Sequence, residues 1–395
     1  MSDSRRLLMI PGPVELSPAV LAACAVPPPG HLDARLVEAF GSALARMRQV
    51  WLAPASSQPF VVPGAGTLAM ELAVANLVEP GDRVLLVNTG TFSERMALML
   101  RRAGAAVREV TAPVGDAPEA EAVARGLDEL HGGGPVKALV ATHVDTSTGV
   151  RIDPEPLARL AHEHGALSIF DGVCATAAER FAMADWQADV YLTASQKAIG
   201  LPPGLALVVA GERALSARAA RRAGPPPAYL DWESWRPIMT AYEERRPAYF
   251  STPATGLVLA LDVGLDEILA GGMERRFADH ERAAGALREA WRVLDLAPVP
   301  VRPRLEANTL SALRFPAGIG PALIGRIAER GVTVAGGLHP ALHGGYFRVG
   351  HMGYVVQRAD LLRRTVEAVA GALGDGGAAV DARAAVAALD RLGGA

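Results

Sequence analysis

The chain has almost no lysine. Of its 39 basic residues, all but Lys137 and Lys197 are arginine. Lysine carries the side-chain amine that forms an imine with a carbonyl compound, so each of the two is a candidate for covalent chemistry. Lys137 precedes the apolar run 138–140, which is typical of a solvated residue at the start of a strand. Lys197 stands in the polar segment 193–200, directly after an apolar run, and is the stronger candidate.

Cysteine and long hydrophobic runs are also scarce. Cys24 and Cys174 are too few for a disulfide framework, which favours a reducing compartment. No stretch approaches the roughly 18 apolar residues that a membrane-spanning helix needs, and the N-terminal apolar run that ends at Pro11 is too short for a signal peptide. The net charge of −3 disfavours nucleic acid and anionic membranes as partners. We therefore expect a cytoplasmic protein that binds neither nucleic acid nor membranes.

Short apolar runs alternate with amphipathic segments through the first half of the chain. The expected strands are 59–63, 84–87, 107–110, 136–141, 166–170, 190–193 and 205–210. The expected helices between them are 33–52, 68–78, 91–103, 117–130 and 154–164, the first capped by Asp33. Buried strands that alternate with helices predict an α/β fold, with a mostly parallel sheet covered on both faces.

A second unit follows the proline run 225–227 and the aromatic-rich segment 229–249. Its expected helices are 255–270, 274–294, 319–330 and 357–373, and its expected strands are 309–315, 332–335 and 346–350. We expect one short amphipathic helix in the tail after Gly374. We expect three parts: an N-terminal arm (1–22), a large domain (23–255) and a smaller C-terminal α+β domain (256–395).

The segment Gly64-Ala65-Gly66-Thr67 lies between an expected strand and an expected helix. The first amides of a helix are free to bind an anion, and glycine lets the backbone approach it. A dinucleotide fingerprint would need an acid after the next strand, where Asn88 stands, and no Gly-Lys-Ser/Thr of a P-loop follows. Alone, the segment is also compatible with a plain tight turn.

Two chemically active residues follow later strands. Asp171 ends an apolar run, where a carboxylate faces the crevice of a parallel sheet, although it could also cap a helix. A buried carboxylate needs a cationic or hydrogen-bonding partner. Lys197 follows the next apolar strand. An anion cradle, a carboxylate and a lone lysine together match pyridoxal 5′-phosphate, which needs a phosphate site, a partner for its ring nitrogen and an amine for its aldehyde.

Several stretches, in order along the chain, resemble class V aminotransferases of fold type I, in the alanine–glyoxylate and serine–pyruvate group. They are residues 7–13, 57–61, 89–93, 142–148, 193–200, 235–239 and 348–353. The resemblance implies a homodimer of fold type I. Its large domain would hold a mostly parallel seven-stranded sheet covered by helices, with a smaller C-terminal α+β domain.

The resemblance also implies roles for individual residues. Lys197 would form the internal aldimine and move a proton, and Asp171 would pair with the ring nitrogen. The phosphate would be held by Ala65, Gly66, Thr67 and Gln196. Phe92 would stack on the ring face, where many relatives have tryptophan, and Ser147 would lie near the ring hydroxyl or the substrate. Gly12 would line the site. Tyr249 and Thr252 would reach the phosphate of the neighbouring subunit.

Arg348 would bind the substrate carboxylate by the same resemblance. Its sequence context agrees, because it stands in the apolar strand 346–349, where an unpaired charge is expensive. A guanidinium matches a carboxylate in a two-bond fork. No metal site is expected, since His339, His343 and His351 lack acidic or cysteine partners at ligand spacing.

The expected reaction is transfer of an amino group from L-alanine to glyoxylate, giving pyruvate and glycine by a ping-pong mechanism. Serine–glyoxylate or serine–pyruvate transamination, or another small-substrate reaction of the same class, is the alternative. A cysteine desulfurase is disfavoured because no cysteine follows Lys197. A binding protein without catalysis is disfavoured by the presence of both Lys197 and Asp171.

Overall fold

The computed structural model describes residues 5–342 and 344–393, and its largest element is a seven-stranded sheet. The strands follow the order β2-β10-β9-β8-β5-β3-β4. They are β2 (Gln58–Gly64), β3 (Arg83–Asn88), β4 (Ala106–Thr111), β5 (Ala138–Thr142), β8 (Leu167–Asp171), β9 (Val190–Ala194) and β10 (Gly204–Ala210). The expected mostly parallel sheet of seven strands is confirmed.

Only β10 runs against its neighbours in this sheet. It pairs antiparallel with both β2 and β9, and the other neighbouring pairs are parallel. Because β2 and β9 both oppose β10, they share one direction. The carboxyl ends of β2, β3, β5, β8 and β9 therefore meet at one edge of the sheet, where sheets of this kind bind ligands.

Helices packed around the sheet complete the large unit. They are α2 (Ala34–Val50), α3 (Gly66–Leu77), α4 (Thr91–Arg102), α5 (Ala120–His131), α6 (Pro154–Glu163), α7 (Glu212–Ala219), α8 (Trp232–Glu243) and α9 (Thr255–Leu269). The side chain of Asp33 accepts a hydrogen bond from the Arg35 amide at 2.8 Å, which confirms the predicted cap of α2. One face of α2 buries Leu36, Phe40 and Met47 in the core of the large unit.

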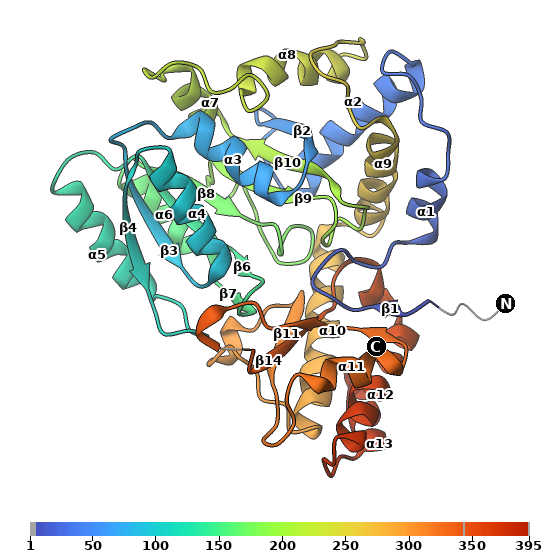
Figure 1. Cartoon of the computed structure of the whole chain (residues 1–395). Helices are drawn as coiled ribbons and strands as arrows, with labels where there is room; N and C mark the ends of the chain where they lie inside the picture. The colour runs from blue at the N-terminus through green and yellow to red at the C-terminus, as the bar shows by residue number, and fades with distance from the viewer. Residues whose placement is uncertain (1–4, 343, 394–395) are drawn as a thin grey trace.

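A second, smaller unit lies below the large sheet in Figure 1, in orange and red. Its antiparallel sheet contains β11 (Leu310–Arg314), β14 (Tyr346–Gly350) and β13 (Ala335–Gly336) in that order. Its helices are α10 (Met273–Val293), α11 (Ala322–Glu329), α12 (Ala359–Asp375) and α13 (Ala382–Gly393), with the short helix η3 (Gly353–Gln357) before α12. Helix α13 confirms the helix predicted for the tail after Gly374. These elements share a second hydrophobic core.

The N-terminal arm is anchored on the second unit. Its strand β1 (Leu7–Leu8) pairs in parallel with β12 (Val332–Thr333), and Leu7 and Met9 lie in the second core. The division of the chain into an arm, a large and a small domain remains a proposal. It assigns α9 to the small domain, but α9 packs its buried side chains into the core of the large unit.

Some short elements were not expected from the sequence. They are α1 (Pro18–Cys24), the helices α7 and α8, and the hairpin of β6 (Val144–Asp145) and β7 (Val150–Arg151). The proline Pro237 inside α8 and the two-residue length of each hairpin strand explain why the sequence pattern did not reveal them. Among the described helices, none has both the length and the apolar character that crossing a membrane requires. The cytoplasmic location stays a prediction.

Candidate active site

Lys197 lies at the carboxyl edge of the large sheet, just after β9. Its amine donates a hydrogen bond to the carbonyl oxygen of Pro11 in the N-terminal arm. Burial lowers the pKa of the Lys197 amine, and the nearby positive charge of Arg348 acts in the same direction. A lowered pKa increases the share of neutral amine, which is the nucleophilic form.

Asp171 ends β8 and is 2% exposed. One carboxylate oxygen accepts a hydrogen bond from the Val173 amide at 2.9 Å. Burial raises the pKa of Asp171 to about 6, the neighbouring charge of Asp145 adds to the rise, and Lys197 opposes it. A cationic partner would lower this pKa, so the carboxylate suits a protonated ring nitrogen.

Removing the charge at residue 171 should stabilise the cofactor-free protein at neutral pH. Since burial raises the pKa of Asp171 from 3.8 to about 6, stability that is present below the unfolded pKa is lost as pH rises through about 6. The shift corresponds to about 3 kcal/mol. Asparagine does not ionise, so Asp171→Asn avoids this loss of stability. Its side-chain oxygen can still accept the hydrogen bond from the Val173 amide. Urea unfolding of the two cofactor-free proteins, wild type and Asp171→Asn, measures their free energies of unfolding. These should be nearly equal below about pH 4, and the variant should become the more stable of the two as the pH rises towards about 8. A variant no more stable than wild type at the higher pH would contradict the assignment.

The first turn of α3 forms an anion cradle. In the described chain, Ala65 caps this helix without a side-chain hydrogen bond, and the first turn holds no acidic residue. A Cβ added at Gly66 would lie 2.9 Å from Cγ2 of Val173 and 3.6 Å from Cβ of Ala194. The start of α3 thus abuts the loop after β8 and the last residue of β9. Its free amides and helix dipole favour a bound anion such as a phosphate.

Two further polar side chains are notable near the candidate site, Gln196 beside Lys197 in sequence and Arg95 at the cradle. Oε1 of Gln196 is buried without a hydrogen-bond partner among residues 5–342 and 344–393. Arg95 donates to Oγ1 of Thr67 at 3.3 Å, and its guanidinium lies 4.8 Å from the centre of the Phe92 ring. Arg95 was not singled out from the sequence, although its spacing of three residues from Phe92 places both on one face of α4.

Asp145 organises the start of α4 and was also missed from the sequence. It is buried and accepts hydrogen bonds from the amides of Phe92 at 3.1 Å and Ser147 at 3.0 Å. The hydroxyl of Ser147 donates to Asp145 and accepts from the Thr91 amide at 3.0 Å. A Cβ at Gly90 would lie 2.7 Å from the Asp145 carboxylate, so only glycine fits there. Asp145 therefore fixes both Phe92 and Ser147.

Arg348 reaches this turn from β14 of the second unit. Its Nε donates to the Gly336 carbonyl at 2.9 Å and its Nη1 donates to the Thr146 carbonyl at 3.1 Å. The neighbouring Tyr346 hydroxyl donates to the Ser147 carbonyl. No ion pair joins Arg348 to a carboxylate anywhere in the described sequence, and burial lowers its pKa. An unpaired guanidinium beside Ser147 is suited to a substrate carboxylate.

Gly12 lets the N-terminal arm pass against Lys197. Its φ is +89°, in the region that favours glycine. A Cβ there would lie 2.6 Å from Cδ of Lys197 and 2.9 Å from the carbonyl oxygen of Gln196. The arm therefore passes directly against Lys197, and the role of Gly12 in lining the site stays a prediction.

Gly12→Ala should weaken both cofactor binding and turnover. The positive φ costs a residue with a side chain roughly 1–2 kcal/mol, and the clash displaces either the arm or Lys197. Misplacement by about 1 Å can lower turnover roughly a hundredfold. Gly30→Ala is the matched control, because a Cβ at Gly30 meets no atom within 4 Å. Cofactor titration and kcat should separate the two variants. Equal behaviour would show that the close approach of the arm is unimportant.

Tyr249 and Thr252 lie in the loop between α8 and α9. Tyr249 is 59% exposed, its hydroxyl lies 3.4 Å from Oγ1 of Thr252, and its ring centre lies 5.0 Å from that of His31. Within the described residues, no hydrogen bond joins either side chain to Lys197 or Asp171. The fold thus leaves this pair available at the surface of the subunit.

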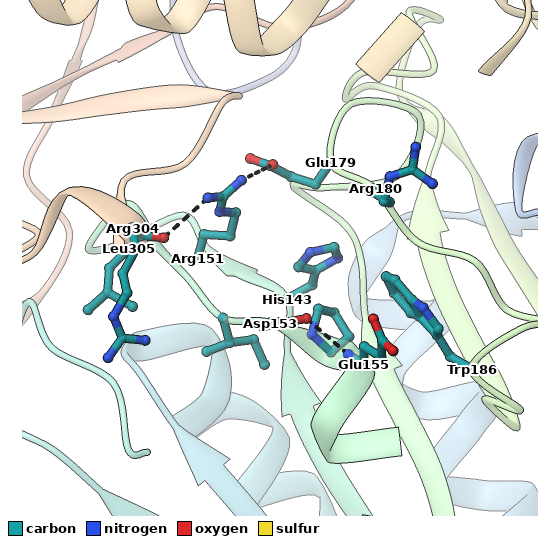
Figure 2. Close-up of a pocket in the computed structure, with 11 residues that line it drawn as sticks. His143, Arg151, Asp153, Glu155, Glu179, Arg180, Trp186, Arg304 and Leu305 are labelled. Atoms are coloured by element: carbon teal, nitrogen blue, oxygen red, sulfur yellow. Dashed lines mark hydrogen bonds and ion pairs between the residues drawn. The ribbon is translucent and has the colours of Figure 1, made fainter. Parts of the chain in front are cut away.

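A separate cavity of about 380 Å³ lies behind the β6–β7 hairpin (Figure 2). Arg151 crosses it, paired with Glu179 at 3.0 Å and donating to the Arg304 carbonyl at 3.2 Å. His143 also lines it, with Nδ1 2.8 Å from the Tyr191 hydroxyl, and burial lowers the His143 pKa to about 3. The ring is therefore neutral. This cavity does not contain Lys197.

His339 and His351, the two described histidines that were considered as metal ligands, do not lie in a cluster of potential ligands. Within the described ranges, no group of three or more histidine, cysteine, aspartate or glutamate side chains could hold a metal ion. His351 instead lies with Nε2 3.0 Å from the Ser311 hydroxyl, and burial lowers its pKa to about 3. His343 lies outside the described residues.

Comparison with known proteins gives concordant results. The sequence profile of the family Aminotransferase class-V matches residues 29–358. The chain is 36% identical to alanine–glyoxylate aminotransferase 1 of Saccharomyces cerevisiae over 374 residues, covering 91% of this chain and 95% of that one. It is 34% identical to L-aspartate–glyoxylate aminotransferase of Paracoccus denitrificans, covering 89% and 87%. The crystal structure of alanine–glyoxylate aminotransferase from Nostoc sp. matches with a TM-score of 0.85 at 31% identity, covering 93% and 95%.

The geometry of the site fits the cofactor of this family, pyridoxal phosphate. The free amides at the start of α3 offer hydrogen-bond donors for a phosphate ester. Lys197 offers an amine of lowered pKa, and Asp171 offers a buried carboxyl for a protonated ring nitrogen. The chain belongs to the class V aminotransferases, which are pyridoxal phosphate enzymes of fold type I.

Proposed function

We propose that this enzyme transfers the amino group of L-alanine to glyoxylate, forming pyruvate and glycine by a ping-pong mechanism. The guanidinium of Arg348, which donates to the Thr146 carbonyl and has no carboxylate partner among the described residues, is the observation that carries the proposal, since it suits a substrate with a carboxylate. The yeast and Paracoccus relatives support glyoxylate as the acceptor, because both names include it. They differ in the amino donor.

Lys197 and Asp171 perform the central chemistry in this proposal. Pyridoxal phosphate, when bound, supplies an electron-withdrawing ring that stabilises negative charge at the substrate Cα. Lys197 would hold the cofactor through its aldehyde, and its amine, once freed by the substrate, would take the Cα proton. Asp171 would keep the ring nitrogen protonated. The lowered pKa of Lys197 and the raised pKa of Asp171 support these roles.

The other predicted residues hold the cofactor and the substrate. We assign the phosphate to Ala65, Gly66, Thr67 and Gln196, and the ring face to Phe92. Ser147 lies near the ring hydroxyl or the substrate, and its fixed position on Asp145 supports that role. Arg348 orients the substrate carboxylate. Gly12 and the arm narrow the site, which favours the small side chain of alanine.

We also propose a homodimer with shared active sites. Tyr249 and Thr252 would serve the phosphate of the neighbouring subunit, and the exposure of Tyr249 on its own subunit supports this. Sedimentation of the holoenzyme should give a dimer. An active monomer would contradict the shared site.

The choice of amino donor is tested by direct competition. At one fixed glyoxylate concentration, kcat/KM for L-alanine should exceed that for L-serine and L-aspartate by about tenfold, the discrimination that one or two groups in a pocket give. Serine–glyoxylate or serine–pyruvate transamination is the alternative. A larger kcat/KM with serine or aspartate would replace alanine as the donor, and would leave the aminotransferase chemistry in place.

A further inference from the structure

Arg276 on α10 is a buried arginine without a carboxylate partner. It is 8% exposed, and it forms no ion pair with any residue of the described chain. Burial lowers its pKa to about 10, so the guanidinium remains charged at neutral pH. Burying an unpaired charge costs several kcal/mol unless other bonds offset it. The position of this group therefore needs a reason.

The guanidinium of Arg276 joins two loops of the active site. Its Nη2 donates to the carbonyl of Ala198 at 2.9 Å, and Ala198 directly follows Lys197. Its Nε donates to the carbonyl of Ala177 at 3.1 Å, in the loop that follows Asp171. One planar group thus bridges the loop that carries Lys197 and the loop that begins at Asp171.

The Asp171 loop is held in a strained conformation at this contact. Ala177 has φ of +62°, a region that costs a residue with a side chain roughly 1–2 kcal/mol. Such strain persists only where surrounding contacts impose it. The bond from Arg276 to the Ala177 carbonyl is such a contact.

Arg276 is itself fixed from the second unit. One turn further along α10, Nδ1 of His280 lies 2.8 Å from the Arg276 carbonyl oxygen. Nε2 of His280 accepts a hydrogen bond from the Gly353 amide at 3.1 Å. A Cβ at Gly353 would lie 3.7 Å from the Ala198 carbonyl oxygen. Two elements of the second unit, α10 and the start of η3, therefore meet at the residue after Lys197.

We propose that Arg276 is a positioning residue, which sets the Lys197 amine relative to Asp171 by binding both of their loops. Its guanidinium binds the backbone carbonyls of the two loops. Its effect on turnover rests on the proposed function, whereas its effect on the placement of Lys197 does not. Arg276 belongs to the second unit, so it also couples the packing of that unit to the catalytic lysine.

The test compares Arg276→Lys and Arg276→Gln with a matched control, Arg218→Lys. Arg218 is equally buried, at 8% exposure, but bonds to Asp231 on the large unit at 2.6 Å. Lysine cannot reproduce the planar fork that spans two carbonyls. We expect kcat of the holoenzyme to fall about 10- to 100-fold in both Arg276 variants, with the KM for the amino acid unchanged. Arg218→Lys should lower the melting temperature and leave kcat unchanged.

A second readout is independent of turnover. The visible absorption of the bound cofactor depends on the protonation of its bond to Lys197, so a displaced lysine shifts the pH midpoint of that absorption. We expect a shifted midpoint in both Arg276 variants and the wild-type midpoint in Arg218→Lys. If the wild type failed to transaminate, this titration would still test Arg276. The proposal would be overturned if both Arg276 variants had the wild-type kcat and the wild-type pH midpoint. It would also be overturned if the fall in kcat simply followed the fall in melting temperature across all three variants.

Discussion

Lys197→Ala is expected to remove essentially all transamination, together with the visible absorption of the bound cofactor. Lys197 is assigned two tasks, bonding to the aldehyde and moving the Cα proton. Proton transfer by a positioned side chain alone contributes roughly 10²–10⁴-fold, so the combined loss should reach at least that range. Steady-state rates per subunit and an absorption spectrum after incubation with pyridoxal phosphate measure both effects.

The scarcity of lysine makes the control for this substitution simple. Lys137 is the one other lysine in the sequence, and its amine lies 4.0 Å from Asp82, remote from the candidate site. Lys137→Arg should retain full activity and colour. Borohydride reduction of the wild-type holoenzyme should label a single peptide, the one containing Lys197. Near-normal turnover by Lys197→Ala, or a label on Lys137, would remove Lys197 from its role.

Arg348→Met is expected to lower kcat/KM for both alanine and glyoxylate by roughly ten- to a hundredfold. A hydrogen bond to a charged group contributes roughly 1.5–3 kcal/mol, and about 1.4 kcal/mol corresponds to a factor of ten. The effect should fall mainly on KM, because the carboxylate is bound before and during the reaction. Both substrates share one carboxylate site, so both should be affected.

Two controls isolate the carboxylate contact. Arg314 on the neighbouring strand β11 is exposed, and Arg314→Met should leave both KM values unchanged. Ethylamine lacks the carboxylate of alanine, so the preference for alanine over ethylamine should shrink in Arg348→Met by the same factor as kcat/KM for alanine. An unchanged KM for alanine in Arg348→Met would place the substrate carboxylate elsewhere.

The sheet was predictable because its strands leave a local pattern. Buried strands such as β5 and β8 are rich in apolar residues, and the polar residue that ends each of them marks the edge where ligands bind. That is why the positions of Lys197 and Asp171 followed from the sequence. The hairpin β6–β7 has strands of two residues each, too short to show any period.

The rest of the site depends on contacts between residues far apart along the chain. Gly12 meets Lys197 across nearly half of the sequence, and Asp145 caps a helix that begins at Thr91. Such contacts arise only when the fold brings the segments together, so no spacing in the sequence reveals them. Arg276 is the extreme case. Among 37 arginines its neighbours in sequence are ordinary, and only its two carbonyl partners distinguish it.

The most direct measurement is the half-reaction with a single amino acid. L-Alanine, added alone to the holoenzyme, should bleach the visible band and release one equivalent of pyruvate per subunit. Glyoxylate added next should restore the band and release one equivalent of glycine. If no small amino acid bleaches the band, or if bleaching releases no oxo acid, the proposed transamination through Lys197 is wrong.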